Sequence, residues 1–331
     1  MLGTRRSLRA PARPRGGRRP RRWSRRSLVG LCLLGALAVT AVVALVPRHP
    51  PAPTPPASEP GRSTSGPETV VIKQGGKLSW APPALLDPTR VVVTPTHRSL
   101  KLDVDRDYTV VLPRTDAPLR SGVTIVGGRN VVIIGGVVSV PSQDEVPSAD
   151  QRRGLYLKGQ TGTVHVEGVR MTGDLSDGVN LDERLGATVQ LQNVLVDRVH
   201  GSAEGHHADV VQTWAGPRVL RIDGLRATTE YQGFFLLPNQ LWKDGDPPME
   251  FTIRRSLVSM EPGSGYALWL PDRRPSWLDY AGLHVQVPQG KSTRRLTWPD
   301  SRLGVPVVDA DADVVLEQDA PGADYQSPGY A

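Results

Sequence analysis

The sequence predicts an all-β solenoid of parallel strands, and three observations support that prediction. A short apolar strand returns repeatedly, usually behind a glycine, as GLYLK from Gly154, GVNLD from Gly178, VVQTW from Val210, GFFLL from Gly233 and GYALW from Gly265. Apolar residues also recur at one position, two on and five on, in the sets Val132/Ile134/Val137, Val164/Val166/Val169, Val189/Leu191/Val194 and Leu220/Ile222/Leu225. The returns are 23 to 32 residues apart, which is typical of coils whose strands are constant and whose loops vary in length.

The first 27 residues differ in charge from the rest of the chain. They contain eleven arginines and no acidic residue, whereas the remainder contains 29 basic and 33 acidic side chains. The net charge of +7 therefore belongs to an Arg-rich tail, residues 1–27, and the rest of the chain is mildly acidic. A mildly acidic domain does not favour nucleic acid as a partner.

Residues 28–46 form an uncharged apolar run of nineteen residues, close to the ~20 residues that a membrane-spanning helix needs. Because arginines precede the run, the positive-inside rule predicts a single-pass signal-anchor in the cell membrane, with a cytoplasmic N-terminus and an extracytoplasmic C-terminal domain. A cleaved signal peptide is the alternative, but the run is longer than a usual signal core. Cys32, the only cysteine, lies inside the run, so the exported domain has no disulfide.

Two segments lie between the predicted anchor and the predicted solenoid. Residues 47–68 are rich in proline, serine and threonine, a composition typical of a disordered, extended linker. Residues 69–107 contain two valine-rich runs that resemble strands, and we expect this segment to cap the first open edge of the solenoid. The linker would hold the domain away from the membrane.

The solenoid itself is predicted over residues 108–290. Short β-branched runs there, such as residues 108–112 and 123–126, alternate with Gly, Pro, Asn and Asp, which predicts strands joined by turns. No part of this region combines a helical period with helix caps. After Gly265 the pattern weakens, and residues 291–331 are expected to form a C-terminal cap that ends in a frayed tail from about Ala320.

The repeated strand pair resembles the right-handed parallel β-helix proteins of the pectin-lyase-like superfamily, of the membrane-anchored, carbohydrate-associated type. The resemblance covers roughly residues 105–290. His207-Ala208-Asp209-Val210-Val211-Gln212 is similar to an H-x-D-G-x-Q block of carbohydrate-associated members, with Val210 in place of the glycine. The resemblance implies the fold well and the function poorly, because this superfamily includes lyases, hydrolases, epimerases and adhesins.

Strand alternation places polar and aromatic residues on one outward face. Aligning the glycine-led strands sends outward Tyr156 and Lys158, Asn180 and Asp182, Gln212 and Trp214, Phe235 and Leu237, and in a further coil Ala267 and Trp269. Aromatic rings stack on sugars while amides and acids bond the hydroxyls, so we expect substrate binding by Asn180, Gln212, Trp214, Tyr231, Gln232 and Phe235. The alternative is that Trp214 and Phe235 pack under a long loop.

Asp177, Asp209 and Gln232 share one register just before the strand, and two interpretations stand side by side. Successive acids are able to bind a cation or to act as acid and base. Asp and Asn also stack at solenoid corners and satisfy turn amides, which is the blander interpretation. His207 bonded to Asp209 is a candidate acid–base pair. His206 and His207 are also candidate metal ligands with Asp209, but neighbouring histidines on a strand face opposite ways, so at most one of them joins Asp209.

The resemblance also implies candidate catalytic groups. In β-helix lyases, acids hold Ca²⁺ and an Arg or Lys removes the α-proton of a uronate, which suggests Asp182 and Asp209 for charge and Lys158, Arg184 or His207 as base. For hydrolysis, Asp182 and Asp209 are the candidate carboxylates. The Asn-Thr-Asp and Arg-Ile-Lys blocks of polygalacturonases are absent from the sequence, which favours a lyase over a hydrolase if the protein is an enzyme.

The sequence therefore predicts a monomer that binds or processes a surface or extracellular polysaccharide, held at the membrane through residues 28–46. Ca²⁺ is the one cofactor that the resemblance suggests. The alternative function is a non-catalytic cell-surface scaffold or adhesin, in which the solenoid serves as a rigid rod.

Overall fold

Strands supply almost all of the regular structure in the computed structural model. The one helical element among the described residues is a three-residue 3-10 turn, Ala149–Gln151. The structure describes residues 69–72, 76–240, 249–273, 275–290, 296–301, 304–308, 313–316 and 320–331. These residues lie in one compact unit, Ser63–Ala331.

Three sheets of parallel strands form the body of the domain. Sheet 1 contains β3 (Ser99–Lys101), β5 (Val123–Val126), β8 (Arg153–Lys158), β11 (Asp177–Asp182), β14 (Asp209–Ala215), β17 (Gln232–Leu236), β20 (Leu268–Trp269) and β23 (Thr297–Trp298). Sheet 2 contains β2 (Thr89–Val92), β4 (Tyr108–Val111), β6 (Val131–Ile134), β9 (Thr163–Glu167), β12 (Thr188–Gln192), β15 (Val219–Asp223), β18 (Glu250–Arg254) and β21 (Leu278–Asp279). Sheet 3 contains β7 (Val137–Val140), β10 (Arg170–Gly173), β13 (Leu195–Val199), β16 (Arg226–Thr229), β19 (Ser256–Met260), β22 (Leu283–Gln286) and β24 (Val307–Val308).

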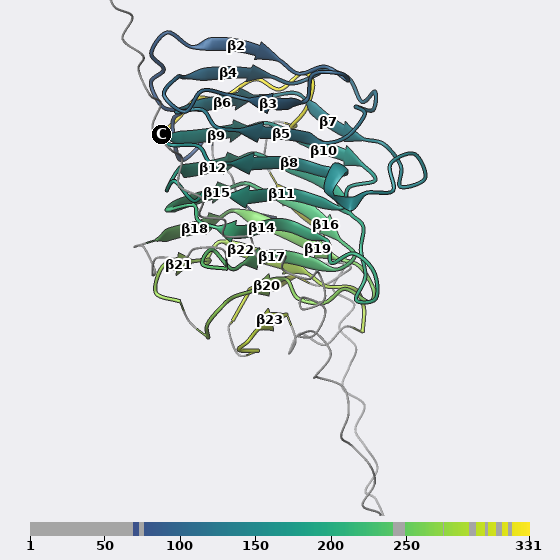
Figure 1. Ribbon diagram of the computed structural model, residues 1–331. Helices are drawn as coiled ribbons and strands as arrows, with labels where there is room; N and C mark the ends of the chain where they lie inside the picture. Colours follow the sequence, from purple (N-terminus) through teal and green to yellow (C-terminus); the bar gives the residue numbers. More distant parts are fainter. Residues whose placement is uncertain are drawn as a thin grey trace, which may run out of the picture. The chain divides into compact units, whose positions relative to one another are not determined.

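Successive coils stack on one another and give each sheet one strand per turn (Figure 1). The coil β11–β12–β13, for example, lies between β8–β9–β10 and β14–β15–β16, and the strands pair in parallel throughout. The predicted parallel β-solenoid is confirmed. Strands β2 and β3 lie within the segment predicted as a cap, yet they pair in register with β4 and β5 and so begin sheets 2 and 1.

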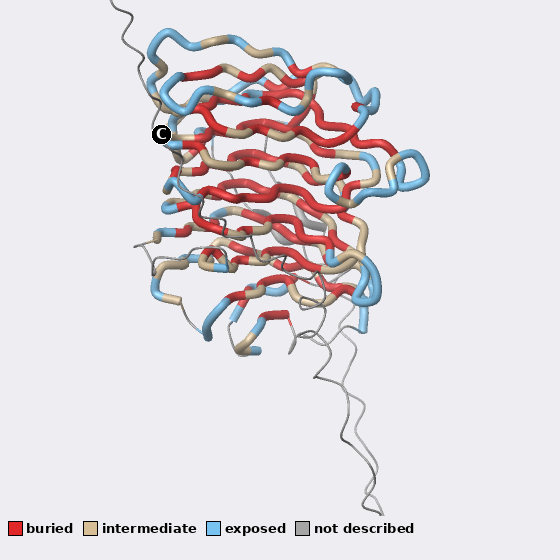
Figure 2. Tube along the Cα trace, viewed as in Figure 1, coloured by how far each residue is buried: buried red, intermediate tan, exposed pale blue. Residues whose placement is uncertain are grey.

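Buried residues recur along successive coils of the stack (Figure 2). The core consists of apolar columns that run from coil to coil. In sheet 1 one column is fully buried and consists of Leu155, Val179, Val211, Phe234 and Leu268. In sheet 2 the predicted positions two apart are confirmed at Val164/Val166, Val189/Leu191 and Leu220/Ile222, all 0% exposed. Each column buries apolar area from every coil, which is the main stabilising term of the fold.

The structure corrects two predictions, an inward Ile134 and an outward Ala267. In β6 the buried partners of Val164 and Val166 are Val131 and Ile133, whereas Ile134 is 42% exposed. A run of four apolar residues leaves alternation undefined, so only pairing with β9 selects the face. In the later coil Trp269 is outward as predicted, but Ala267 is buried, because Phe234 pairs with Leu268.

Glycine at the second position of several sheet 1 strands permits close stacking of the coils. A Cβ on Gly178 would lie 2.4 Å from the carbonyl oxygen of Val210, and one on Gly233 would lie 2.4 Å from that of Ala267. These distances are far below van der Waals contact, so no side chain fits there. The glycine-led motif therefore reflects backbone approach between coils.

Residues near the two ends of the described chain meet on the outside of sheet 2, where Trp80 bonds Gln192 and Tyr330 bonds Glu167. Leu78 forms a parallel bridge with Tyr330, and β1 (Thr69–Ile72) pairs with β25 (Asp313–Leu316). The prediction of a frayed tail from Ala320 is wrong, because Tyr325 and Tyr330 donate hydrogen bonds to the buried Glu167 at 2.8 and 2.6 Å. Burial of a carboxylate needs such donors, and the tail supplies them.

The Arg-rich tail, the apolar run 28–46 and the linker 47–68 lie outside the described residues. Within the described part of the chain, no helix has the length and apolar character that a membrane crossing requires. The anchor and the cellular location therefore remain predictions from sequence.

Candidate functional site

One outward column of sheet 1 combines aromatic and amide side chains, largely as the sequence predicts. Its members pair across neighbouring strands and are Tyr156, Asn180, Gln212, Phe235, Trp269 and Trp298. Neighbouring parallel strands lie about 4.8 Å apart, so the column places one side chain per coil along the solenoid axis. Trp298 was not foreseen, because the apolar repeat has faded by that coil.

Six rings on this face form what we call the aromatic strip, defined as Tyr156, Trp214, Phe235, Tyr266, Trp269 and Trp298. At one end the Tyr156 and Trp214 centroids are 5.6 Å apart. At the other end Trp269 lies 5.5 Å from Phe235, 5.3 Å from Tyr266 and 5.6 Å from Trp298. All six rings are partly or well exposed, which contrasts with the fully buried column on the inner face.

Trp214 reaches the strip through a β-bulge. The pairing of β11 with β14 shifts after Leu181, so that Asp182 faces Ala215 and Trp214 is the extra residue. A bulge bends the strand and redirects the side chain. Trp214 therefore contacts Tyr156 across β11, and Asn180, which pairs with Tyr156 in the intervening strand, is 0% exposed.

Asp182 is held as an ion rather than as an acid. Its carboxylate accepts hydrogen bonds from Arg184 at 2.6 and 3.1 Å and forms an ion pair with Lys158 at 3.1 Å. Burial opposes ionisation, but the bonds from Arg184 and Lys158 lower the pKa of Asp182. A general acid needs a raised pKa, so this environment does not suit Asp182 for proton donation.

Lys158 and Arg184 are correspondingly fixed as cations. The hydrogen bond to Asp182 is the largest cause that raises the pKa of each. A general base must be deprotonated at the working pH. Two of the three bases that the resemblance suggested therefore sit in environments that oppose this role.

Asp177 and Asp209 occupy the same corner position in successive coils, as predicted. The Asp209 N–H donates to Asp177 Oδ1 at 2.9 Å, and Asn180 Nδ2 and Arg153 Nε donate to Asp177 Oδ2 at 3.3 and 3.4 Å. His206 Nε2 lies 3.3 Å from Asp177 Oδ1. Asp177 therefore satisfies a turn amide between coils, which supports the corner interpretation for this residue.

Asp209 differs from Asp177 in its partners. It is 1% exposed, and its Oδ1 atom has no hydrogen-bond partner among the described residues. Burial, followed by the charge of Asp177, raises the pKa of Asp209 well above its usual range. Of these two carboxyls, which lie one coil apart, Asp209 is therefore the one that favours the protonated form.

His207 and Asp209 are not joined in the way that the sequence suggested. The His207 ring is exposed, stacks on Tyr231 with centroids 4.8 Å apart, and bonds the Ala203 carbonyl oxygen at 3.2 Å. Its neighbour His206 makes the carboxylate contact instead, and with Asp177. Adjacent side chains face opposite ways, so only one of the two histidines is directed at the corner.

The predicted carboxylate pair Asp182 and Asp209 is also separated. Asp182 lies five residues beyond Asp177, the coil partner of Asp209, which corresponds to roughly 16 Å at about 3.3 Å per residue. Glycoside hydrolysis needs carboxyls about 5–9.5 Å apart. Asp182 and Asp209 therefore do not form a hydrolytic pair in this structure.

Two of the predicted amide residues, Asn180 and Gln212, lie between Tyr156 and Phe235 in the outward column of sheet 1. Asn180 Nδ2 donates to Gln212 Oε1 at 2.7 Å. Gln232 pairs in register with Asp209 and is 2% exposed. Gln212 is therefore the more accessible amide, and it lies between the Tyr156–Trp214 contact and Phe235.

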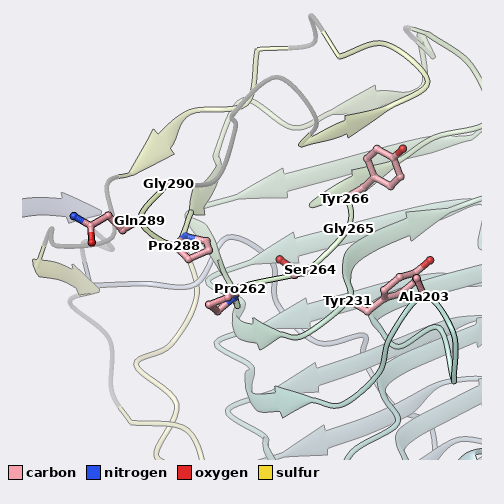
Figure 3. Close-up of a pocket in the computed structure, with 10 residues that line it drawn as sticks. Ala203, Tyr231, Pro262, Ser264, Gly265, Tyr266, Pro288, Gln289 and Gly290 are labelled. Carbon is pink, nitrogen blue, oxygen red and sulfur yellow. The ribbon is translucent and has the colours of Figure 1, made fainter. Parts of the chain in front are cut away.

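A pocket of about 570 Å³ opens beside the Phe235 end of the strip (Figure 3). Its lining is Ala203, Tyr231, Pro262, Gly263, Ser264, Gly265, Tyr266, Pro288, Gln289 and Gly290. Tyr266 belongs to both the pocket and the strip, and Tyr231 connects the pocket to His207. The volume falls within the range of about 300–1,000 Å³ typical of small-molecule sites.

Sequence reasoning missed Arg153, Tyr266, the pocket and the contact of His206 with Asp177. Arg153 directly precedes Gly154 and so shares the register of Asp177, which was a usable signal. Its guanidinium lies 4.7 Å from the Trp214 ring centroid, a cation–π contact. The pocket joins four parts of the chain, at Ala203, at Tyr231, at residues 262–266 and at residues 288–290, and nothing local in the sequence indicates it.

No group of three or more His, Cys, Asp or Glu side chains suited to a metal ion is present in the part of the chain that the structure describes. The suggestion of Ca²⁺ therefore remains a prediction. Comparison of the chain with protein-family models, with curated protein sequences and with solved structures gave no match.

Proposed function

We propose that this protein binds a polysaccharide along the outer face of sheet 1. The observation that carries the proposal is the aromatic strip, in which Phe235, Trp269 and Trp298 lie on successive coils beside Gln212 and the pocket. Rings stack on the apolar faces of sugars, and a row of rings at about 4.8 Å per coil suits a linear polymer. Partly exposed rings gathered on one face are typical of a binding surface.

The remaining parts of the proposal come from the sequence. The solenoid is consistent with the right-handed β-helix of the pectin-lyase-like superfamily, and we extend it to that superfamily on the H-x-D-x-x-Q block at His207. The apolar run 28–46 supports an envelope-anchored protein with an extracytoplasmic domain. An exposed binding face on a stalk is suited to a surface glycan.

The test is binding of the purified full-length chain, kept in a mild detergent, to a panel of neutral and acidic polysaccharides by affinity electrophoresis. Trp269→Ala should weaken binding by about tenfold or more, the usual effect of removing a central aromatic. Trp277→Ala is the matched control, since Trp277 is also half-buried but packs on Phe251 in sheet 2. Equal loss in both variants, or no binding to any glycan, would favour the scaffold or adhesin function.

Polysaccharide processing is the second candidate function, and one observation favours it. Asp209 has a raised pKa beside the charge of Asp177, the arrangement that separates an acid from a base. Both side chains are 1% exposed, so substrate access requires movement of Arg153 or of the loop that carries His206. The test is release of reducing ends or of unsaturated uronate by the native chain and by Asp209→Asn.

A further inference from the structure

We infer that the ligand of the aromatic strip is a neutral glycan, one end of which occupies the pocket lined by Tyr231 and Tyr266. The inference rests on the proposed function and names its substrate class. The argument comes from the charges that face the strip and from the chemistry of the pocket lining.

The cations beside the Tyr156 end are already engaged. Arg153 is paired with Asp150 at 2.5 Å and with Asp177 at 3.4 Å. Lys158 and Arg184 share Asp182 at 3.1 and 2.6 Å. Three cations therefore face three carboxylates, while Asp209 favours its neutral form. At this end an acidic sugar would meet no excess of positive charge, because Asp177 and Asp182 stay buried beside these cations.

The Phe235 end offers rings, hydroxyls and amides. The strip residues there are Phe235, Trp269 and Trp298, and the described pocket lining contains no charged side chain. Tyr231, Tyr266, Ser264 and Gln289 supply polar groups able to meet sugar hydroxyls. A carboxylate placed among these groups would lose water without gaining an opposite charge, which is costly.

The geometry also indicates where the bound polysaccharide would end. Tyr266 contacts both Trp269 and Trp298 and lines the pocket, so a polymer that follows the rings reaches the pocket at the last coils. Tyr231 and Tyr266 lie on the same side of the pocket, from neighbouring turns of the chain (Figure 3). One terminal sugar would therefore fit between the two phenols and the Pro262–Gly265 turn.

The experiment compares matched polymers. Neutral glucans and xylans, and the same glucans carboxylated at the primary alcohol, are titrated against the full-length chain at about 0.05 and about 0.5 M NaCl. We expect the carboxylated polymer to bind about tenfold more weakly, and neutral binding to change less than about twofold with salt. Tighter binding of the carboxylated polymer, weakened by salt, would overturn the neutral class alone, whereas binding of neither polymer would overturn the proposed function as well.

Two variants sharpen the test. Asp182→Asn leaves Lys158 and Arg184 without their carboxylate and should raise the affinity for the carboxylated glucan at low salt. If that variant does not fold, Asp150→Asn removes an exposed carboxylate beside Arg153 and makes the same test there. Unchanged affinity in a folded variant would contradict the charge argument. Tyr266→Ala should weaken short neutral oligosaccharides more than Tyr156→Ala does, and the reverse order would overturn the terminal site.

Discussion

The backbone N–H of Asp209 donates a 2.9 Å hydrogen bond to Oδ1 of Asp177, the residue at the same corner one coil earlier. This bond makes Asp177 a structural residue, because its carboxylate also meets Arg153, Asn180 and His206. The same geometry leaves Asp209 buried beside a like charge. The repeated acid therefore bonds the next coil at Asp177, whereas at Asp209 it is buried and its pKa is raised.

Removal of the Asp177 carboxylate should destabilise the domain. Asp177→Ala leaves the Asp209 N–H without its side-chain acceptor in a buried site and removes one of the partners of Arg153 and Asn180. We expect a loss of about 2–4 kcal/mol in the free energy of unfolding by urea denaturation. Asp150→Ala, which removes an exposed partner of Arg153, should cost less than about 0.5 kcal/mol. Equal losses in the two variants would contradict the corner role.

Glu183 should make stability fall as pH rises. It accepts a 2.9 Å bond from the Gln160 N–H, and burial raises its pKa to about 8 from its usual 4.5. Because the folded value is the higher one, folding takes up a proton, and the carboxyl lowers stability progressively from about pH 4.5 through about pH 8. Unfolding of the native chain and of Glu183→Gln across this range should diverge, and parallel curves would argue against the shifted pKa.

The C-terminal tail should contribute measurably to stability. Tyr325→Phe removes the phenol that donates to Glu167 Oε1 at 2.8 Å, and loss of a buried bond to a carboxylate should cost about 1–3 kcal/mol by thermal or chemical unfolding. Tyr280→Phe serves as the comparison, since it leaves the Glu167 cluster intact. A frayed tail would instead predict no change for Tyr325→Phe.

Gly178 should not tolerate even a methyl group. Gly178→Ala places Cβ 2.4 Å from the Val210 carbonyl oxygen, so two coils must separate, at a cost of about 1–3 kcal/mol or more. Gly304→Ala is the matched control, because a Cβ there has no neighbouring heavy atom within 4 Å. Far-ultraviolet circular dichroism with denaturation distinguishes the two, and a tolerated Gly178→Ala would refute the close-approach argument.

The face assignments follow from the sequence wherever alternation is clean. In GVNLD, Val179 and Leu181 are inward and Asn180 and Asp182 outward, as strand alternation requires. In Val131–Ile134 all four residues are apolar, so the pattern does not indicate which of them face inward, and there the prediction was wrong. Candidate site residues on regular strands could therefore be predicted, whereas the bulge that carries Trp214 could not.

By itself the sequence determined the solenoid, its repeated glycines and the outward column through Asn180, Gln212 and Phe235, because period and alternation are local properties of the chain. Only the tertiary structure decided which residues each acid contacts. Asp182 takes Lys158 and Arg184, Asp209 stands beside Asp177, and His206 replaces His207 at the corner. Those partnerships depend on contacts between coils and on loop paths, which residue spacing along one strand does not specify. The pocket at Tyr231 and Tyr266 arises in the same way, from turns brought together by stacking.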